Sequence, residues 1–326
     1  MTVGVGVIGV GLMGRRHAEN VLRVPGARLV AVADARREAA DAAGRDLGAA
    51  TCTVEALLAR DDVHAVIVAS PAAHHEEHAV AAARAGKDML VEKPVASTLE
   101  AADRVIAAAR EAGVRLQVGF HRRYDPPYLE ARRLLQSGAL GAPLLYRGVN
   151  RDRDAGPCGP RGSWPRSDIL VESAIHDLDG ARWMLRDEVQ AVRASVATVS
   201  SDAACPDVAL VQLSFAGGVL AEVEALRGAR YAYDIRTEIV CERGAILIGS
   251  FAQGPLVVLR EGDVVPGTFP GFLERYAEAY ATEVRDFLDG VIGRRPTGAS
   301  GADGRRALEI ALAADTAAAE GREVLL

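Results

Sequence analysis

Apolar and polar positions follow two different patterns along this chain of 326 residues. In the first third, short apolar runs alternate with stretches whose apolar positions recur every three or four residues. The strands predicted there are Val5–Val10, Arg28–Ala33, Ala65–Ala69, Asp88–Val91 and Leu116–Gly119, and the helices are Arg15–Leu22, His75–Ala85 and Leu99–Ala112. This alternation predicts an α/β fold, in which a parallel sheet carries helices on both faces.

After about residue 120 the strands become longer and alternate apolar with polar positions. Strands are predicted at Val189–Val199, Val208–Phe215, Val219–Leu226, Asp234–Cys241 and Ala245–Ile248, and helices at Pro127–Ser137, Ser173–Leu185, Leu273–Gly290 and Ala302–Ala319. We therefore predict a Rossmann dinucleotide-binding domain at residues 1–120 and an α+β domain with a large, mostly antiparallel sheet at residues 121–326. The second domain is expected to bind substrate and to form oligomers, since one sheet face needs cover.

Composition narrows the class of protein. The chain has a net charge of −6 and no basic tract, so nucleic acid is not an expected partner. No apolar run is long enough to span a membrane, and the N-terminal segment reads as a strand and not as a signal peptide, so we expect a cytoplasmic protein. The cysteines are far apart and form no CxxC pair, which argues against a zinc or redox motif.

A glycine-rich turn joins the first predicted strand to the first predicted helix. Gly9 permits the tight turn, Gly11 lets the backbone approach a pyrophosphate, and Gly14 lets helix and strand pack closely. The helix N-terminus offers N–H groups to the phosphates. Asp34, about twenty residues further on, is placed to accept hydrogen bonds from both ribose hydroxyls of NAD. The predicted cofactor contacts in this segment are Gly9, Gly11, Leu12, Met13, Gly14 and Asp34.

The acid at position 34 predicts NAD, and not NADP, as the cofactor. Its carboxylate would repel a 2′-phosphate and would itself be left without a partner. Arg36 and Arg37 follow closely enough to weaken this discrimination, and Arg36 is a further predicted cofactor contact.

Six short motifs occur along nearly the whole chain. They are Gly9–Gly14, Glu92-Lys93-Pro94, Gly119–Asp125, Ile175–Asp179, Tyr231–Asp234 and Phe272–Tyr276. Together they resemble the Gfo/Idh/MocA oxidoreductases, and within that family the inositol 2-dehydrogenases. The resemblance implies NAD-dependent oxidation of a secondary ring hydroxyl, and assembly into homodimers or homotetramers through the sheet. It also implies that Ser70, Pro71, His75 and Glu92 lie at the cofactor.

Lys93 is the first predicted catalytic residue. It follows a parallel strand, at the end where open α/β sheets place their ligands. Oxidation of an alcohol requires loss of the hydroxyl proton as hydride leaves the carbon. A partly desolvated lysine beside the positive nicotinamide ring would have a lowered pKa, which suits proton relay. The resemblance implies this role and a cofactor contact. The alternative is a surface lysine before a turn proline.

Glu172 and His176 form the second predicted catalytic pair. Their i,i+4 spacing places both side chains on one face of a helix. The resemblance implies that the histidine accepts the proton of the reacting hydroxyl, and that an aspartate at the position of Glu172 binds substrate and orients the set. Glutamate extends the carboxylate by one methylene. The alternative is a helix with an N-terminal acid and a packed histidine.

Further substrate contacts are predicted from the resemblance at Arg122 and Tyr233, and Trp164 lies in a loop over 151–168 that is expected to shape the substrate mouth. His121 replaces the usual Met or Asn. Acids at Asp152, Asp154, Asp168 and Glu172 would favour an amine-bearing ring and make free myo-inositol a poor substrate. Alternatively, these acids pair with Arg151, Arg153, Arg161 and Arg166.

The run His74-His75-Glu76-Glu77-His78 formally fits an inverted zinc-protease pattern. Its place in a βα connection of a nucleotide fold argues against that interpretation, so no metal is expected. The sequence predicts a dehydrogenase of a cyclitol or sugar. Two alternatives stay open: a dehydrogenase of an aminated or glycosylated ring in aminoglycoside biosynthesis, and a non-catalytic NAD(P)-binding sensor.

Overall fold

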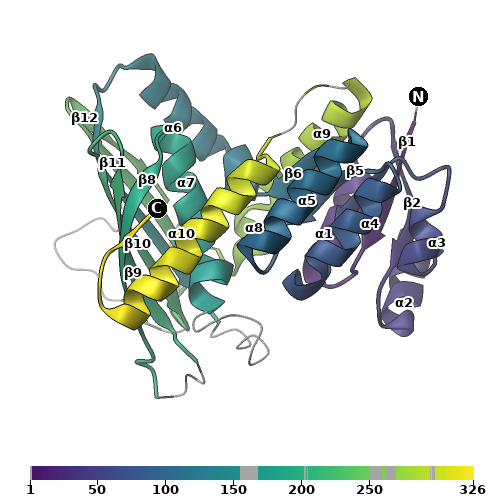
Figure 1. Ribbon diagram of the computed structural model, residues 1–326, viewed down its shortest axis with the longest axis horizontal. Helices are drawn as coiled ribbons and strands as arrows, with labels where there is room; N and C mark the ends of the chain where they lie inside the picture. Colours follow the sequence, from purple (N-terminus) through teal and green to yellow (C-terminus); the bar gives the residue numbers. More distant parts are fainter. Residues whose placement is uncertain are drawn as a thin grey trace. The chain divides into compact units, whose positions relative to one another are not determined.

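The computed structural model describes residues 2–154, 168–201, 203, 205–249, 259–260, 269–293, 295 and 298–326. The chain divides into two compact units. Unit 1 comprises Met1–Tyr124 and Glu278–Arg306, and unit 2 comprises Asp125–Ala277 and Ala307–Leu326. Figure 1 labels the elements of both units. No helix in the described part of the chain is long and apolar enough to cross a membrane.

Unit 1 is built on a six-stranded parallel sheet in the order β3-β2-β1-β4-β5-β6. Its strands are β1 (Val3–Ile8), β2 (Ala27–Ala33), β3 (Ala50–Thr51), β4 (Ala65–Val68), β5 (Asp88–Glu92) and β6 (Leu116–Gly119). Its helices are α1 (Leu12–Val21), α2 (Arg37–Leu47), α3 (Val54–Leu58), α4 (His75–Arg84), α5 (Leu99–Ala112) and α9 (Ala277–Gly293), with short turns η1 (Ala72–His74) and η2 (His121–Tyr124). The strand order reverses at β1 and β4, whose carboxyl ends therefore open a crevice for a ligand.

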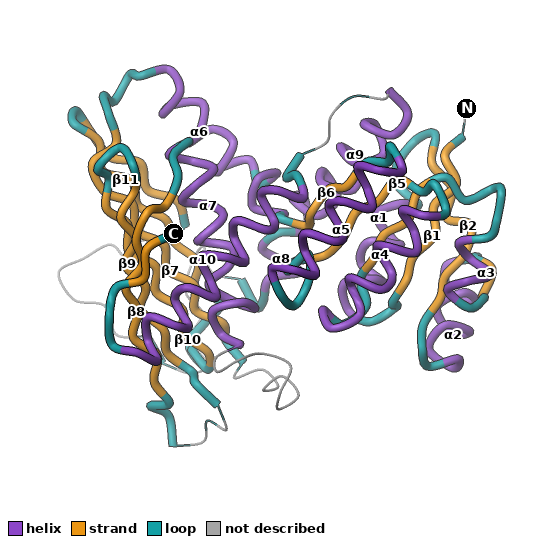
Figure 2. Tube along the Cα trace, viewed as in Figure 1, coloured by secondary structure: helices purple, strands orange, loops and turns teal. Residues whose placement is uncertain are grey.

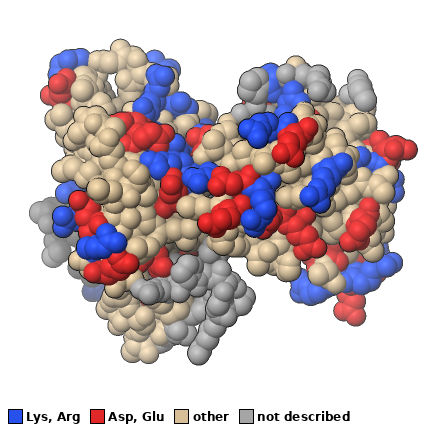
Figure 3. Space-filling view, viewed as in Figure 1, with Lys and Arg blue, Asp and Glu red and all other residues tan. Residues whose placement is uncertain are grey.

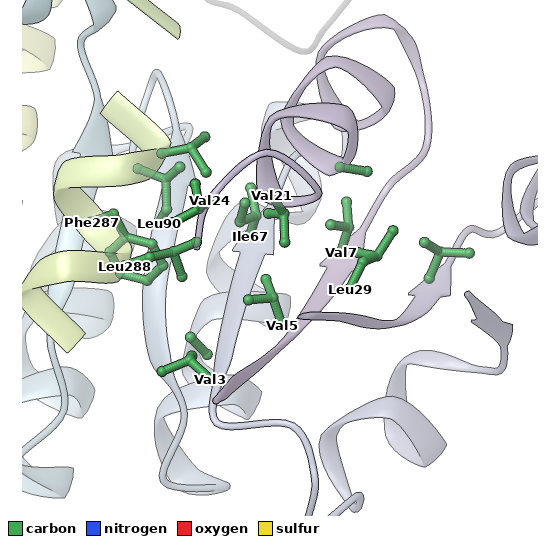
Figure 4. Close-up of a cluster of buried hydrophobic side chains, with 14 of the residues drawn as sticks. Val3, Val5, Val7, Val21, Val24, Leu29, Ile67, Leu90, Phe287 and Leu288 are labelled. Carbon is green, nitrogen blue, oxygen red and sulfur yellow. The ribbon is translucent and has the colours of Figure 1, made fainter. Parts of the chain in front are cut away.

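The core of unit 1 explains why its strands are continuously apolar. Every residue of β1 and β4 is buried, because helices cover both faces of the sheet. Figure 4 shows Val5, Val7 and Ile67 of these strands in one cluster. Phe287 and Leu288 of α9 join the same cluster, although they lie about two hundred residues further along the chain.

This packing corrects the predicted domain boundary for one segment. Residues 278–306, which the sequence assigned to the second domain, belong to unit 1. Val284, Phe287 and Leu288 are fully buried in its core. The segment also lines the edge of the sheet, because the amide of Val118 donates to the carbonyl oxygen of Ala299 at 2.8 Å. An edge strand with its backbone groups covered in this way is protected from pairing with other chains.

Unit 2 contains a seven-stranded sheet in the order β12-β11-β7-β10-β9-β8-β13. Its strands are β7 (Pro143–Asp152), β8 (Val189–Ala197), β9 (Val208–Phe215), β10 (Leu220–Arg227), β11 (Asp234–Cys241), β12 (Gly244–Ile248) and β13 (Val324–Leu325). Its helical elements are α6 (Pro126–Ser137), η3 (Leu170–Ala174), α7 (Ile175–Leu185), α8 (Phe272–Arg275) and most of α10 (Gly301–Glu320). Figure 2 shows α6 and α7 beside this sheet, where α6 packs on β12 and α7 packs on β7 and β10.

The sequence missed β7, an internal strand of this sheet. It pairs antiparallel with β11 and parallel with β10, so the sheet is mixed. Gly148 interrupts its apolar pattern for a steric reason. A Cβ at Gly148 would lie 2.6 Å from Oδ1 of Asp177 in α7, so only glycine allows the strand and helix to approach this closely.

Surface charges of both signs are interspersed on the face shown in Figure 3. Many of them pair locally, as Arg60 does with Asp62 at 2.8 Å. Exposed pairs of this kind contribute little to stability, so the fold rests mainly on its two buried cores.

Candidate functional site

The three glycines of the turn in unit 1 have different surroundings. Gly9 has φ +89°, and a Cβ there would lie 2.6 Å from the carbonyl oxygen of Ala69. At Gly14 a Cβ would lie 1.8 Å from the carbonyl oxygen of Gly9, so helix α1 packs directly on the turn. Gly11 differs, because a Cβ there would meet no atom within 4 Å. Space is therefore left at the residue where a pyrophosphate is expected to approach.

Helix α1 begins at this open position without a side-chain cap. Gly11 is its N-cap residue and, having no side chain, makes no side-chain capping bond to the first turn. Such a turn leaves backbone N–H groups and the positive end of the helix dipole for an anion. Leu12 is 61% exposed and Met13 is half-buried, so the side chains flanking the turn are accessible.

Asp34 follows β2 and is held in place by backbone amides. Its Oδ2 accepts from the amide of Val10 at 2.9 Å, and its Oδ1 accepts from the amide of Arg36 at 2.9 Å. The Arg36 guanidinium is exposed and lies 3.8 Å from Oδ1. Each carboxylate oxygen keeps a further lone pair, so an oriented carboxylate stands ready to accept from a diol.

The end of β5 carries Glu92, Lys93 and Pro94, with a cis peptide bond between Lys93 and Pro94. Glu92 and Pro94 are buried, and Lys93 between them is half-buried. The side chain of Glu92 accepts from the amide of Lys93 at 3.1 Å through Oε2. The lysine is therefore held between two buried neighbours, at the strand end where the sequence predicted a ligand.

The carboxylate of Glu92 is bound inside unit 1. Nε2 of His17, a fully buried residue of α1, lies 2.6 Å from its Oε1. Burial acts to raise the pKa of Glu92, but the hydrogen bond from His17 and the charges of His17, Lys93 and His75 outweigh it and lower the pKa below its usual value. Glu92 is thus an anion that supports the strand end, and its direct contact with a cofactor stays a prediction.

The βα connection after β4 contains Ser70, Pro71 and His75. The hydroxyl of Ser70 lies 2.9 Å from Nδ1 of His78, and His75 is 1% exposed. Both ring nitrogens of His75 contact backbone carbonyl oxygens, those of Pro94 and Ser70, at 2.7 Å each. The two segments predicted to contact the cofactor are therefore joined to each other through this histidine.

The turn η2 after β6 places Arg122 and His121 inside unit 1. Both residues are 3% exposed. The His121 ring packs against Tyr280 of α9 with centroids 4.4 Å apart. Arg123 beside them pairs with Asp303 at 3.2 Å. From the sequence, we expected His121 to change the shape of the substrate site. In the structure its ring packs against Tyr280 of α9.

Glu172 and His176 lie in unit 2, at the entry to α7. The turn Leu170–Ala174 that contains Glu172 is π-helical, where an α-helix was predicted from Ser173. Across residues 171–180 only Glu172 and His176 are half-buried, and the other residues are buried. The two side chains therefore emerge from the same otherwise buried stretch, and π-helical turns of this kind are frequent at functional sites.

The acids predicted at the substrate mouth have specific partners within unit 2. Asp168 forms a buried ion pair with Arg227 at 2.9 Å, and Oδ2 of Asp152 accepts from the hydroxyl of Ser173 at 2.9 Å. Arg151 pairs with Glu224 at 2.5 Å and so does not neutralise these acids. Trp164, the predicted substrate contact of this loop, lies outside the described residues, which end at Asp154 and resume at Asp168.

The two tyrosines of the Tyr231–Asp234 motif have different surroundings. The Tyr231 hydroxyl donates to Oδ2 of Asp234 at 2.7 Å and accepts from Arg151 at 3.0 Å. Tyr233 is 8% exposed and packs edge-on against Tyr276, with ring centroids 6.5 Å apart. Tyr233 thus belongs to an aromatic cluster of unit 2, and its contact with substrate stays a prediction.

Sequence reasoning missed two buried groups behind the end of β5. His17 lies on α1, and its partner Glu92 is 75 positions away. Glu283 of α9 is fully buried, and neither carboxylate oxygen has a hydrogen-bond partner among the described residues. Burial, and then the charges of Glu92 and Asp286, raise the pKa of Glu283 well above its usual value. An acid inside a helix of mostly apolar inward positions was the only available signal.

Comparison with known proteins identifies the family of this chain. Residues 3–120 match the model of the oxidoreductase family with an NAD-binding Rossmann fold, and residues 128–247 match the GFO/IDH/MocA C-terminal domain. The chain is 36% identical to the inositol 2-dehydrogenase of Rubrobacter xylanophilus over 316 residues, which cover 95% of this chain and 89% of that protein.

Two solved structures extend the likeness. The myo-inositol dehydrogenase of Lactobacillus casei, in complex with NAD(H) and myo-inositol, has a TM-score of 0.88 and 30% identity, covering 100% of this chain and 97% of the other. GenD2 from gentamicin A biosynthesis, in complex with NAD, has a TM-score of 0.86 and 27% identity, covering 100% and 96%. The chain therefore belongs to the Gfo/Idh/MocA family of NAD-binding oxidoreductases, as its motifs predicted.

Proposed function

We propose that this chain is an NAD-dependent dehydrogenase that oxidises one secondary hydroxyl of a cyclitol to a ketone. The observation that carries the cofactor is the contrast among the three glycines, where only Gly11 faces open space, beside an uncapped helix N-terminus and an oriented Asp34. The inositol dehydrogenases among its relatives support the substrate class.

The chemistry divides between positioning and proton transfer. Bound NAD supplies the acceptor for the hydride that leaves the carbinol carbon. Lys93 and His176 are the groups assigned to take the hydroxyl proton, because an amine and an imidazole can each accept a proton from a positioned hydroxyl. Glu172, Arg122 and Tyr233 are assigned to orient the ring. Anchored Glu92 and Pro94 hold the lysine at a fixed place, which favours proton transfer over an untethered side chain.

The test measures kcat/KM for myo-inositol, scyllo-inositol and aldoses, with NAD and with NADP, through the absorbance of the reduced cofactor. We expect turnover of at least one inositol and a preference for NAD, because Asp34 would lie against the 2′-phosphate of NADP. Turnover of none of these substrates would contradict the assignment, and a clear preference for NADP would contradict the role of Asp34.

The likeness to GenD2 supports a second candidate, an aminated or glycosylated ring as substrate. The sequence argument for it rested on acids at the mouth. The buried pairing of Asp168 with Arg227 removes one of those charges, which weakens the argument without touching Glu172. Aminoglycosides in the same substrate panel separate the two candidate functions. If the substrate is an aminated or glycosylated ring, the enzyme should turn over aminoglycosides, and free myo-inositol should be a poor substrate.

The open face of the sheet in unit 2 supports assembly into a homodimer or homotetramer. On the strands β9, β10 and β12, Leu210, Leu220 and Leu247 are 44%, 57% and 53% exposed. Helices α6 and α7 pack on the opposite face. Apolar side chains on an uncovered sheet face favour burial against a second copy of the chain.

A further inference from the structure

His75 has a ring geometry that determines its protonation. Nδ1 lies 2.7 Å from the carbonyl oxygen of Pro94, and Nε2 lies 2.7 Å from the carbonyl oxygen of Ser70. A carbonyl oxygen only accepts, so each nitrogen must donate. Neutral imidazole carries one N–H and would set a nitrogen lone pair against an oxygen lone pair at the other contact. Rotating the ring does not remove the conflict, because both acceptors are carbonyl oxygens.

Two other histidines of unit 1 show that this arrangement is specific. Nδ1 of His64 accepts from the amide of Gly4 at 2.9 Å, so that ring is neutral. Nε2 of His17 lies against Glu92, whereas its buried Nδ1 has no hydrogen-bond partner among the described residues. Of these three, His75 alone has an acceptor on each nitrogen.

We propose that His75 is a buried imidazolium that joins the Ser70 segment to the Lys93-Pro94 segment, and that it is a positioning residue for Lys93. The assignment deepens the proposed function, since it rests on Lys93 acting in proton transfer. A second bond joins the same two loops, from the Ser97 hydroxyl to the carbonyl oxygen of Ala72 at 3.2 Å. The two loops are therefore joined by a charged hydrogen bond near Lys93 and by a neutral hydrogen bond further away.

The surroundings of His75 must offset the cost of a buried cation. His75 is the first residue of α4, where the helix dipole disfavours positive charge. Glu77 in the same turn opposes that effect, whereas the carboxylate of Glu76 is paired with Arg104. The anion of Glu92 offers further compensation, because the charge of His75 is the smallest of the causes that lower its pKa. The other titratable groups nearby are His17, Lys93 and His78.

The hydrogen bond to Pro94 has a consequence for Lys93. The charges of His75 and Lys93 both act on Glu92, so the two residues lie at the same strand end. Because Nδ1 of His75 contacts the carbonyl oxygen of Pro94, the residue after Lys93, the histidine fixes the backbone that carries the lysine.

The first test observes the proton directly. Nitrogen NMR of the full-length protein labelled at its seven histidines would follow each ring from about pH 6 to 9. We expect one ring to keep both protons across the range, and His75→Gln to remove that signal. His64 serves as the neutral reference. Absence of any persistent imidazolium in the wild-type protein would overturn the proposal. This outcome depends neither on whether the variant folds nor on the activity of the enzyme.

The second test measures the effect on Lys93. In His75→Gln we expect kcat to fall by up to about 10²-fold while KM changes much less, because the hydrogen bond that fixes Pro94 beside Lys93 is lost. His64→Gln, at the other end of the sheet, should change neither. An unchanged kcat in a folded His75→Gln variant would overturn the positioning role. An inactive wild-type enzyme with a persistent imidazolium would instead contradict the proposed function and leave the charge assignment standing.

Discussion

The two sheets of this protein expose different parts of their surface, and this difference bears on where ligands and a second copy of the chain would bind. In unit 1 every residue of β4 is buried, so only the loops beyond its ends are open to a ligand. In unit 2 the strand β9 alternates buried with accessible residues, so a whole face remains open. A sheet covered on both sides offers ligands its ends, whereas a sheet covered on one side offers a surface.

The two ends of β5 allow the largest test of this comparison, because the chain has only two lysines and they flank that strand. Lys93 follows its carboxyl end, and Lys87 precedes its amino end. Lys93→Ala should lower kcat by about 10²- to 10⁴-fold while NAD still binds, since proton transfer is lost. Steady-state kinetics and a cofactor-binding titration measure both quantities.

Lys87→Ala is the matched control. Its ammonium donates to the carbonyl oxygens of Arg60 and Val63 at 2.9 and 2.8 Å, so it fastens loops at the amino end of the sheet. We expect a loss of stability of about 1 to 3 kcal/mol with kcat almost unchanged. Equal kinetic effects from the two lysines would show that the ends of the sheet do not differ in the way proposed.

Gly14 and Gly11 sharpen the comparison within one turn. Gly14→Ala would place a methyl group against the carbonyl oxygen of Gly9 and should destabilise unit 1 by about 1 to 3 kcal/mol or more. Gly11→Ala meets no atom of the protein and should leave the unfolding midpoint nearly unchanged while it weakens NAD binding. Denaturant unfolding measures the effect on stability, and NAD titration measures the effect on binding. Unchanged NAD binding in Gly11→Ala would show that the pyrophosphate does not bind at this position.

Local sequence pattern predicted what is local in this fold. Helix α5 begins and ends where its apolar spacing and its stop at Gly113 predicted, because both signals lie within the element. The pattern missed β7 because Gly148 interrupts its apolar alternation. The need for glycine there comes from close packing against Asp177 of a later helix. It also missed the return of residues 278–306 to unit 1. Both depend on contacts between distant segments, which periodicity does not encode.

The same distinction applies to the candidate site. The glycines and Asp34 were predicted because their spacing is part of one supersecondary unit. The bond between His17 and Glu92 joins two elements 75 positions apart, and no spacing rule connects them. The π-helical turn at Glu172 likewise followed no visible signal, since its residues also suit an α-helix.

The open face of unit 2 should respond to charge where unit 1 does not. Leu220→Lys places an ammonium on that face, at a residue 57% exposed, and should shift the protein toward a smaller assembly. Leu22→Lys on unit 1, at a residue 53% exposed, is the control and should leave the mass unchanged. Light scattering at micromolar concentration reports both masses. A monomeric wild-type protein would refute assembly through this face.

The smallest expected effect is a change in stability with pH that comes from Glu283, an acid buried in unit 1. Its raised pKa means that the folded state holds the proton more tightly than the unfolded state, where the pKa is about 4.3. The folded protein therefore has no penalty from this group below that value. As pH rises above it, the unfolded state loses the proton first, and stability falls by up to about 1.4 kcal/mol per pH unit.

Glu283→Gln removes this titration, so the stability of the variant relative to wild type should increase from about pH 5 to pH 7. Urea unfolding at several pH values measures the difference, and taking a difference cancels the slopes of all other groups that titrate equally in both proteins. Glu278→Gln, an exposed position on the same helix, is the control and should show a nearly constant difference. A constant difference for Glu283→Gln as well would mean that the carboxyl group is ionised in the folded state. It would then require a compensating cation beside α9.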